Sequence, residues 1–129
     1  MIKFFVPGTP RPQPRPYVTK SGYVFENDKG RARRWRDAIA IVAKTHRPRN
    51  PFTSGVVVGL LFVFKSKNTG CHTKRPDLDN LIKAVLDAIN GLGFWPDDSH
   101  VCAIRACKCY ATDTMHEGVN ISIGEETQP

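Results

Sequence analysis

The stretch from residue 74 to residue 91 reads KRPDLDNLIKAVLDAING and predicts an amphipathic helix. Pro76 is well placed just before a helix start, and Gly91 ends the pattern. Between these limits, apolar residues recur with the spacing of one buried helix face: Leu78, Leu81, Ile82, Val85, Leu86 and Ile89. This segment therefore predicts a helix that packs one face against a core.

Two carboxylates stand at the start of this predicted helix. Asp77 and Asp79 are two residues apart, which on a regular helix separates them by about 200°. They can share a site only if Asp77 precedes the helix, and Pro76 favours that placement. Lys83 and Asp87 follow Asp79 on one helix face.

A second pair, Asp97 and Asp98, follows in the segment FWPDDSHV of residues 94–101. Each carboxylate taken singly fits a helix cap or a loop. Together they are harder to explain, because like charges repel unless a cation or a proton neutralises them. Hard oxygen ligands suit Mg²⁺ or Mn²⁺, and in a basic protein they indicate metal-assisted hydrolysis of a phosphodiester.

The N-terminal part of the chain predicts a strand, an extended loop, a pair of short strands and a helix. Residues 2–6 read as a strand, and residues 7–16 as an extended Pro-rich loop. Two short strands between Tyr17 and Phe25 surround a turn at Ser21-Gly22. A helix capped by Asn27 or Asp28 runs to about His46, with apolar spacing at Trp35, Ala38, Ile39 and Val42.

Apolar alternation predicts the strands of the sheet. Residues 56–64 are apolar at nearly every position, which suits a central strand covered on both faces. Residues 101–111 and 119–123 predict two closing strands, antiparallel to each other, before a polar tail at 124–129. The expected fold is one small α+β domain over residues 1–129, with a mixed β-sheet packed against two main helices.

Charge is unevenly distributed along the 129 residues, whose formal net charge is +7. Residues 1–49 carry 12 basic and 3 acidic residues, whereas residues 50–129 carry 7 basic and 9 acidic ones. A basic half of this density favours a polyanion such as nucleic acid. No apolar run reaches the ~20 residues of a membrane span, and the amino terminus lacks a secretory signal, so we expect a cytoplasmic protein.

Two blocks of the sequence combine these features in a fixed order: RPDLDNLIKAVLDA at residues 75–88 and GFWPDDSHV at residues 93–101. They resemble the RusA family of Holliday junction resolvases, which are phage-associated endonucleases that cut four-way DNA junctions. Residues 6–8 and 15–18 resemble the family's opening more weakly. Pro76 replaces a basic residue of some relatives and the Pro-rich loop is longer, but neither departure removes a candidate ligand.

This resemblance implies a role for each matching position. Asp77 and Asp79 match the family's paired metal-binding aspartates, and Asp98 matches its third catalytic carboxylate. Asp97 is a candidate fourth ligand, and Lys83 matches a lysine that the family needs for catalysis. The implied cofactor is Mg²⁺, with Mn²⁺ as an alternative, and no small-molecule cofactor is expected.

The same resemblance implies a homodimer in a bacterial or phage-infected cell, with one active site per subunit, so that a four-way junction receives two symmetric nicks. We take six basic residues as candidate DNA contacts: Arg11, Arg15, Arg33, Arg36, Lys74 and Arg75.

Two other functions stay open from the residues. One is a basic protein that binds branched DNA without cutting it, although clustered carboxylates would repel the phosphates. The other is a metal-dependent nuclease that acts on flaps, forks or structured RNA. A zinc site at Cys71, His72, Cys107 and Cys109 is conceivable. Reduced thiols are the favoured interpretation of the four cysteines, which include Cys102 as well as these three.

Overall fold

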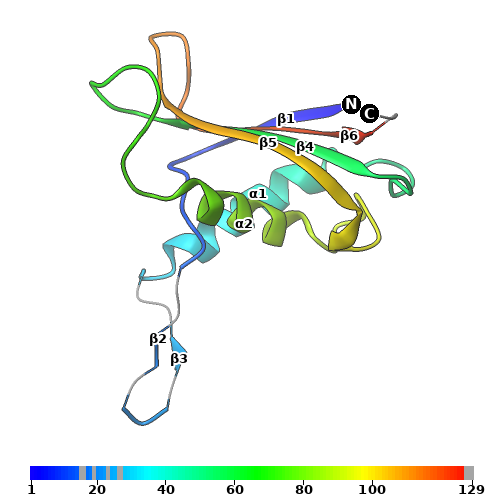
Figure 1. The fold of residues 1–129 in the computed structure, drawn as a ribbon, viewed down its shortest axis with the longest axis horizontal. Coiled ribbons are helices and arrows are strands. Elements are labelled where there is room, and N and C mark those ends of the chain that lie inside the picture. Colours follow the sequence, from blue (N-terminus) through cyan, green and yellow to red (C-terminus); the bar gives the residue numbers. More distant parts are fainter. Residues whose placement is uncertain (15–16, 19, 23, 26–27, 127–129) are drawn as a thin grey trace.

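The computed structural model describes residues 1–14, 17–18, 20–22, 24–25 and 28–126. In chain order its elements are β1 (Ile2–Pro7), β2 (Tyr17–Val18), β3 (Val24–Phe25), α1 (Arg31–Lys44), β4 (Val56–Phe64), α2 (Leu78–Ile89), the 3₁₀ turn η1 (Asp98–His100), β5 (Val101–Tyr110) and β6 (Gly118–Glu125). Figure 1 shows both long helices beneath one mixed sheet, so the predicted α+β fold is confirmed.

The sheet has the strand order β1-β6-β4-β5. β4 pairs in parallel with β5 and antiparallel with β6, which in turn pairs antiparallel with β1. The last two strands run antiparallel to each other, as predicted, but they do not pair directly, because β4 lies between them. β6 also continues through Glu125, so the sheet includes two residues of the predicted polar tail.

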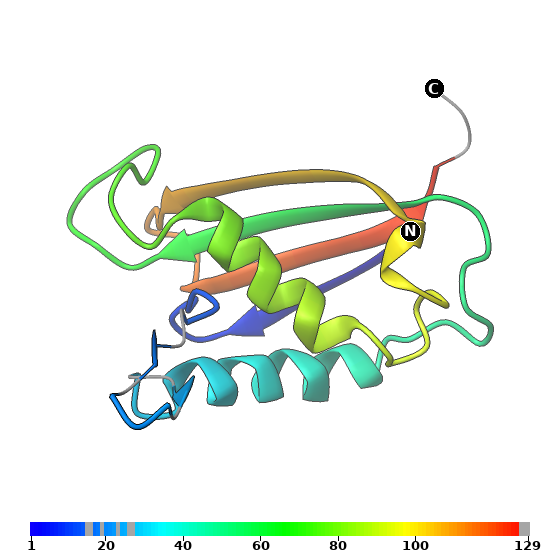
Figure 2. The same ribbon diagram turned by 60° about the horizontal axis from the view of Figure 1, so that its bottom comes forward.

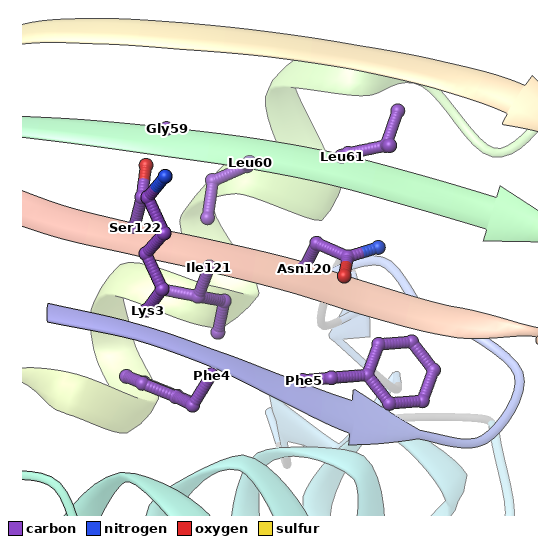
Figure 3. Close-up of a pocket in the computed structure, with 9 residues that line it drawn as sticks. All are labelled: Lys3, Phe4, Phe5, Gly59, Leu60, Leu61, Asn120, Ile121 and Ser122. Carbon is purple, nitrogen blue, oxygen red and sulfur yellow. The ribbon is translucent and has the colours of Figure 1, made fainter.

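β4 is a central strand, as predicted, but helices cover only one of its faces (Figure 2). Val56, Val58, Leu60 and Phe62 alternate toward the helices and are buried. The prediction that both faces are covered is wrong: on the other face, a shallow hollow of about 540 Å³ lies over β1, β4 and β6 (Figure 3).

Helix α1 packs its predicted apolar face on the core, where Trp35 and Ile39 are buried. Gly30 is the N-cap residue, and Asp28 supplies the capping carboxylate, which accepts hydrogen bonds from the backbone N–H of Gly30 (3.0 Å) and of Ala32 (2.7 Å). The alternative cap, Asn27, lies outside the described residues, and the helix ends at Lys44, two residues before the predicted His46.

The remaining elements agree with the predictions made from the sequence. β2 and β3 pair antiparallel, as predicted for the segment around Ser21-Gly22. α2 buries Leu81, Val85 and Ile89 against the sheet. Within the described residues, neither helix has the length and hydropathy that a bilayer span requires.

Candidate active site

Helix α2 begins at the paired carboxylates. Asp77 is its N-cap, with the extended backbone angles φ −70° and ψ 141°, and Asp79 lies in the first turn. The Asp77 carbonyl accepts the N–H of Leu81 at 3.2 Å, whereas its carboxylate makes no capping hydrogen bond. The prediction that Asp77 precedes the helix is therefore confirmed, and its side chain is free for another use.

Both carboxylates are exposed, and neither has a hydrogen bond or ion pair within the part of the chain that the structure describes. The positive end of the α2 dipole favours negative charge at this position. Lys83 is also exposed and stands one turn beyond Asp79. Because Mg²⁺ is commonly held by one or two carboxylates, waters and substrate phosphates, the donors at this helix start fit that cation.

A hollow of about 530 Å³ opens beside Asp77, between the Pro-rich segment and the start of α2. Arg11 lines it from the Pro-rich side and Arg75 from the segment before α2. Cationic side chains thus line the same hollow as a carboxylate, an arrangement suited to a phosphodiester held beside a metal ion.

The Pro-rich segment is held to both helices through Gln13. Its backbone N–H donates to the carbonyl of Asn80 in α2 at 3.0 Å, and its side-chain Oε1 accepts a 2.9 Å hydrogen bond from Arg36 of α1. Arg36, a predicted DNA contact, therefore has a structural partner at this site. The sequence analysis missed Gln13, and the signal that could have indicated it is a polar side chain within a proline-rich run.

Lys108 is a residue of this site that the sequence analysis missed. Its ammonium group donates hydrogen bonds to the carbonyls of Lys74 (2.5 Å) and Pro76 (2.6 Å), directly before Asp77. The strand alternation could have indicated it, because the buried Tyr110 two residues later shares its face. A lysine on the helix-facing side of a strand needs acceptors, and here backbone carbonyls supply them.

Asp97 and Asp98 lie at the other end of the sheet. η1 directly precedes Val101, the first residue of β5, whereas Lys108 contacts the segment before Asp77 near the last residue of that strand (Figure 1). Lys108 lies seven positions after Val101 along the strand, which corresponds to about 23 Å. Within one chain the structure does not bring Asp98 to Asp77 and Asp79, and the described residues contain no group of three potential metal ligands.

Asp97 already has a local role. Its carboxylate accepts hydrogen bonds from the Ser99 hydroxyl (2.7 Å) and the Ser99 N–H (3.5 Å), and thereby caps η1. These hydrogen bonds lower the pKa of Asp97 below its ordinary value. Asp98 is exposed and has no such partner among the described residues.

The other predicted DNA contacts are distributed over the N-terminal half and the segment before α2. Arg33 and Lys74 are exposed, and Arg15 lies outside the described residues. The structure adds Arg31 and Arg34, which line a second hollow together with Arg11. The zinc site is not formed, because His72 is buried between the rings of Phe64 and Tyr110, with centroid distances of 4.4 and 4.7 Å.

Comparison with known proteins assigns the chain to a family. The model for "Endodeoxyribonuclease RusA" matches residues 7–123. The crossover junction endodeoxyribonuclease RusA of Escherichia coli K12 is 29% identical over 75% of this chain and 81% of its own length. The corresponding protein of Enterobacteria phage 82 is 30% identical over the same shares, and "Uncharacterized protein YqaN" of Bacillus subtilis is 29% identical over 90% of this chain and 92% of its own. The chain therefore belongs to the RusA family of endodeoxyribonucleases.

Proposed function

We propose that this protein is a Mg²⁺-dependent endodeoxyribonuclease that resolves four-way DNA junctions by paired, symmetric nicks in the cytoplasm of a bacterial or phage-infected cell. One observation carries this proposal: exposed Asp77 and Asp79 flank the start of α2 beside a hollow lined by arginines. The similarity to the junction endonucleases of Escherichia coli and phage 82 supports the substrate class.

The residues at the start of α2 have different roles in phosphodiester hydrolysis. Asp77 and Asp79 would hold the cation, which would supply Lewis-acid polarisation of the scissile phosphate. Arg11 and Arg75 orient the DNA backbone by charge-assisted hydrogen bonds. Lys83, one turn into the helix, offsets negative charge that develops in the transition state.

Asp98 takes part through a second copy of the chain. Its distance from Asp77 within one chain excludes a shared ion there, yet a two-fold dimer can place the start of one β5 beside the end of the other. Each site then combines Asp77 and Asp79 of one subunit with Asp98 of the other. Two such sites, related by the dimer axis, suit two symmetric nicks.

The free edge of β5 is the surface that offers this arrangement. Hydrogen bonds between residues 70–72 and residues 108–110 cover only the last part of that edge, and no described strand pairs with residues 101–107 there. Ile104, in the middle of this stretch, is 39% exposed. Long, apolar strand edges are templates for pairing with another chain. Antiparallel pairing of two such edges centred near Ile104 brings Asp98 of each copy toward the end of the other strand.

The first test is cleavage of a labelled four-way junction by wild type and Asp79→Asn, with Mg²⁺ or with EDTA. Duplex, fork and flap substrates of matched sequence are the controls. Symmetric nicks that need Mg²⁺ and disappear in the variant support the proposal. Junction binding without cleavage would leave a DNA-binding protein, and preferential cutting of a control would change the substrate.

The second test separates a shared site from one built within a chain. Subunits carrying Asp79→Asn are mixed with subunits carrying Asp98→Asn and allowed to exchange. A shared site leaves one intact site in every heterodimer, so about a quarter of the wild-type nicking rate returns from two inactive preparations. A mixture as inactive as its components would assign Asp98 to its own chain.

A further inference from the structure

Two cysteines face each other across the short ladder that covers the end of β5. Cys71 forms an isolated antiparallel bridge with Cys109. The flanking hydrogen bonds run from His72 N–H to the Lys108 carbonyl (3.1 Å) and from Tyr110 N–H to the Gly70 carbonyl (3.0 Å). Because these bonds join the neighbouring residues, Cys71 and Cys109 are a non-hydrogen-bonded pair, the kind whose side chains approach most closely.

That geometry matches the requirement of a disulfide. Non-hydrogen-bonded antiparallel pairs have Cα atoms about 4.5 Å apart, and disulfides join Cα atoms roughly 4.4–6.8 Å apart. Both thiols are reduced in the structure, and Cys71 is exposed.

Neither of the other cysteines offers a comparable pairing. Cys107 and Cys109 lie on one strand two residues apart, so their Cβ atoms are separated by about 6.5–7 Å, whereas a disulfide needs roughly 3.5–4.5 Å. Cys107 is a diagonal neighbour of Cys71, at about 7–8 Å. Cys102 lies at the opposite end of β5, where its thiol contacts the Val56 carbonyl.

We propose that Cys71 and Cys109 form a reversible disulfide, with low-molecular-weight disulfides as the oxidant. This bond attaches the segment leading into α2 covalently to β5. Residues 65–77 connect β4 to the start of α2 and carry Arg75 and Asp77. Lys108, the neighbour of Cys109, already binds the carbonyls of that segment. The disulfide makes the same attachment covalent.

The chemistry balances with oxidised glutathione. The Cys71 thiolate attacks one sulfur of glutathione disulfide, and one glutathione thiolate leaves. The Cys109 thiolate then attacks the Cys71 sulfur of the mixed disulfide and releases the second glutathione. The two protein thiols lose two protons and two electrons, and glutathione disulfide takes up both to become two molecules of reduced glutathione. Cys71 reacts first because burial and the nearby thiols raise the pKa of Cys109.

Tryptic mapping can identify the bond directly, because each cysteine falls in a different tryptic peptide. Cys71 lies in residues 68–74, Cys102 in 84–105, Cys107 in 106–108 and Cys109 in 109–129. The full chain is equilibrated with oxidised and reduced glutathione over a range of ratios, its free thiols are blocked, and it is then digested without reductant. Wild type, Cys71→Ser, Cys109→Ser and the control Cys102→Ser are compared.

We expect peptide 68–74 linked to peptide 109–129 in wild type and Cys102→Ser. In both proteins Tm rises by several degrees on oxidation and returns on reduction, because the bond restricts the unfolded chain. Both effects are absent in Cys71→Ser and Cys109→Ser. A link to peptide 106–108, bonds only between chains, or no linked peptide at the most oxidising ratio would overturn the proposal.

Discussion

The ammonium group of Lys108 in β5 donates a hydrogen bond to the carbonyl oxygen of Pro76, with 2.6 Å between Nζ and the oxygen. A second hydrogen bond from the same Nζ reaches the carbonyl of Lys74. Hydrogen bonds from an ionised donor are stronger than neutral ones. The residues directly before Asp77 are therefore fixed to the sheet, and the position of the first turn of α2 depends on Lys108, which lies 32 residues after Pro76 in the chain.

Replacing Lys108 by Met tests this attachment. The change leaves two carbonyl acceptors without their donor, and we expect the free energy of unfolding to fall by about 1–3 kcal/mol. Urea denaturation measures the loss. Arg105→Met is the matched control, because Arg105 is exposed on the same strand and should change stability by less than about 0.5 kcal/mol. Equal effects of the two variants would show that the Lys108 hydrogen bonds contribute little.

Local pattern was enough to predict the elements that frame the site. Pro76 and the apolar spacing from Leu78 to Ile89 predict α2, and they also place Asp77 outside the helix and Asp79 inside it. These features act over one or two turns, so the sequence displays them directly.

The pairing of strands that lie far apart in the sequence was harder to predict. β4 and β5 pair in parallel because α2 connects them, and a connection of that length is what parallel neighbours require. The β4-α2-β5 order contained this information, but the sequence analysis did not assign a strand order. The length of β5 also separates Asp98, which lies just before the strand, from Asp77, which lies near its last residues. The two sequence blocks that carry these aspartates do not by themselves indicate how far apart they lie in the folded chain.

Asp28 provides a test of helix capping at α1. Its two carboxylate oxygens accept the N–H groups of Gly30 and Ala32. We expect Asp28→Ala to lower the free energy of unfolding by about 1 kcal/mol and Asp28→Asn to lower it less. Thermal unfolding followed by circular dichroism measures both. Asp37→Ala, an exposed position within the same helix, is the control, and a loss as large as that of Asp28→Ala would rule out a capping effect.

Gly118, the first residue of β6, is a position where only glycine fits. Its φ of +155° is rare for other residues, and a Cβ there would clash with the backbone carbonyl of Val6 and the Phe5 ring. We expect Gly118→Ala to cost about 2–4 kcal/mol of stability. Gly70→Ala is the comparison, since Gly70 also has a positive φ of +84°, but no atom of the described residues lies within 4 Å of where its Cβ would stand. Similar losses would show that backbone strain, not the clash at Val6, determines the cost.

The thiol of Cys109 should respond to pH differently from that of Cys71. Burial and the neighbouring thiols raise the pKa of Cys109, so the folded chain favours its neutral form. That contribution to stability is complete at neutral pH and is lost as the pH rises past the raised pKa. In timed alkylation with iodoacetamide near pH 8, read by peptide mass, Cys109 should react more slowly than Cys71 and approach its rate at higher pH. Equal rates near pH 8 would contradict the shift.

Ile104 tests the proposed pairing of two β5 edges. In such a pairing Ile104 lies near the two-fold axis, so Ile104→Lys brings two positive charges close together and removes apolar contact. We expect sedimentation equilibrium to show a dimer for wild type and a monomer for the variant, with junction cleavage lost at the same time. Ile41→Lys is the control, because Ile41 is 66% exposed on α1, away from this edge. A dimeric and active Ile104→Lys variant would exclude the β5 edge as the interface, whereas a monomeric but fully active one would show that each chain completes its own site.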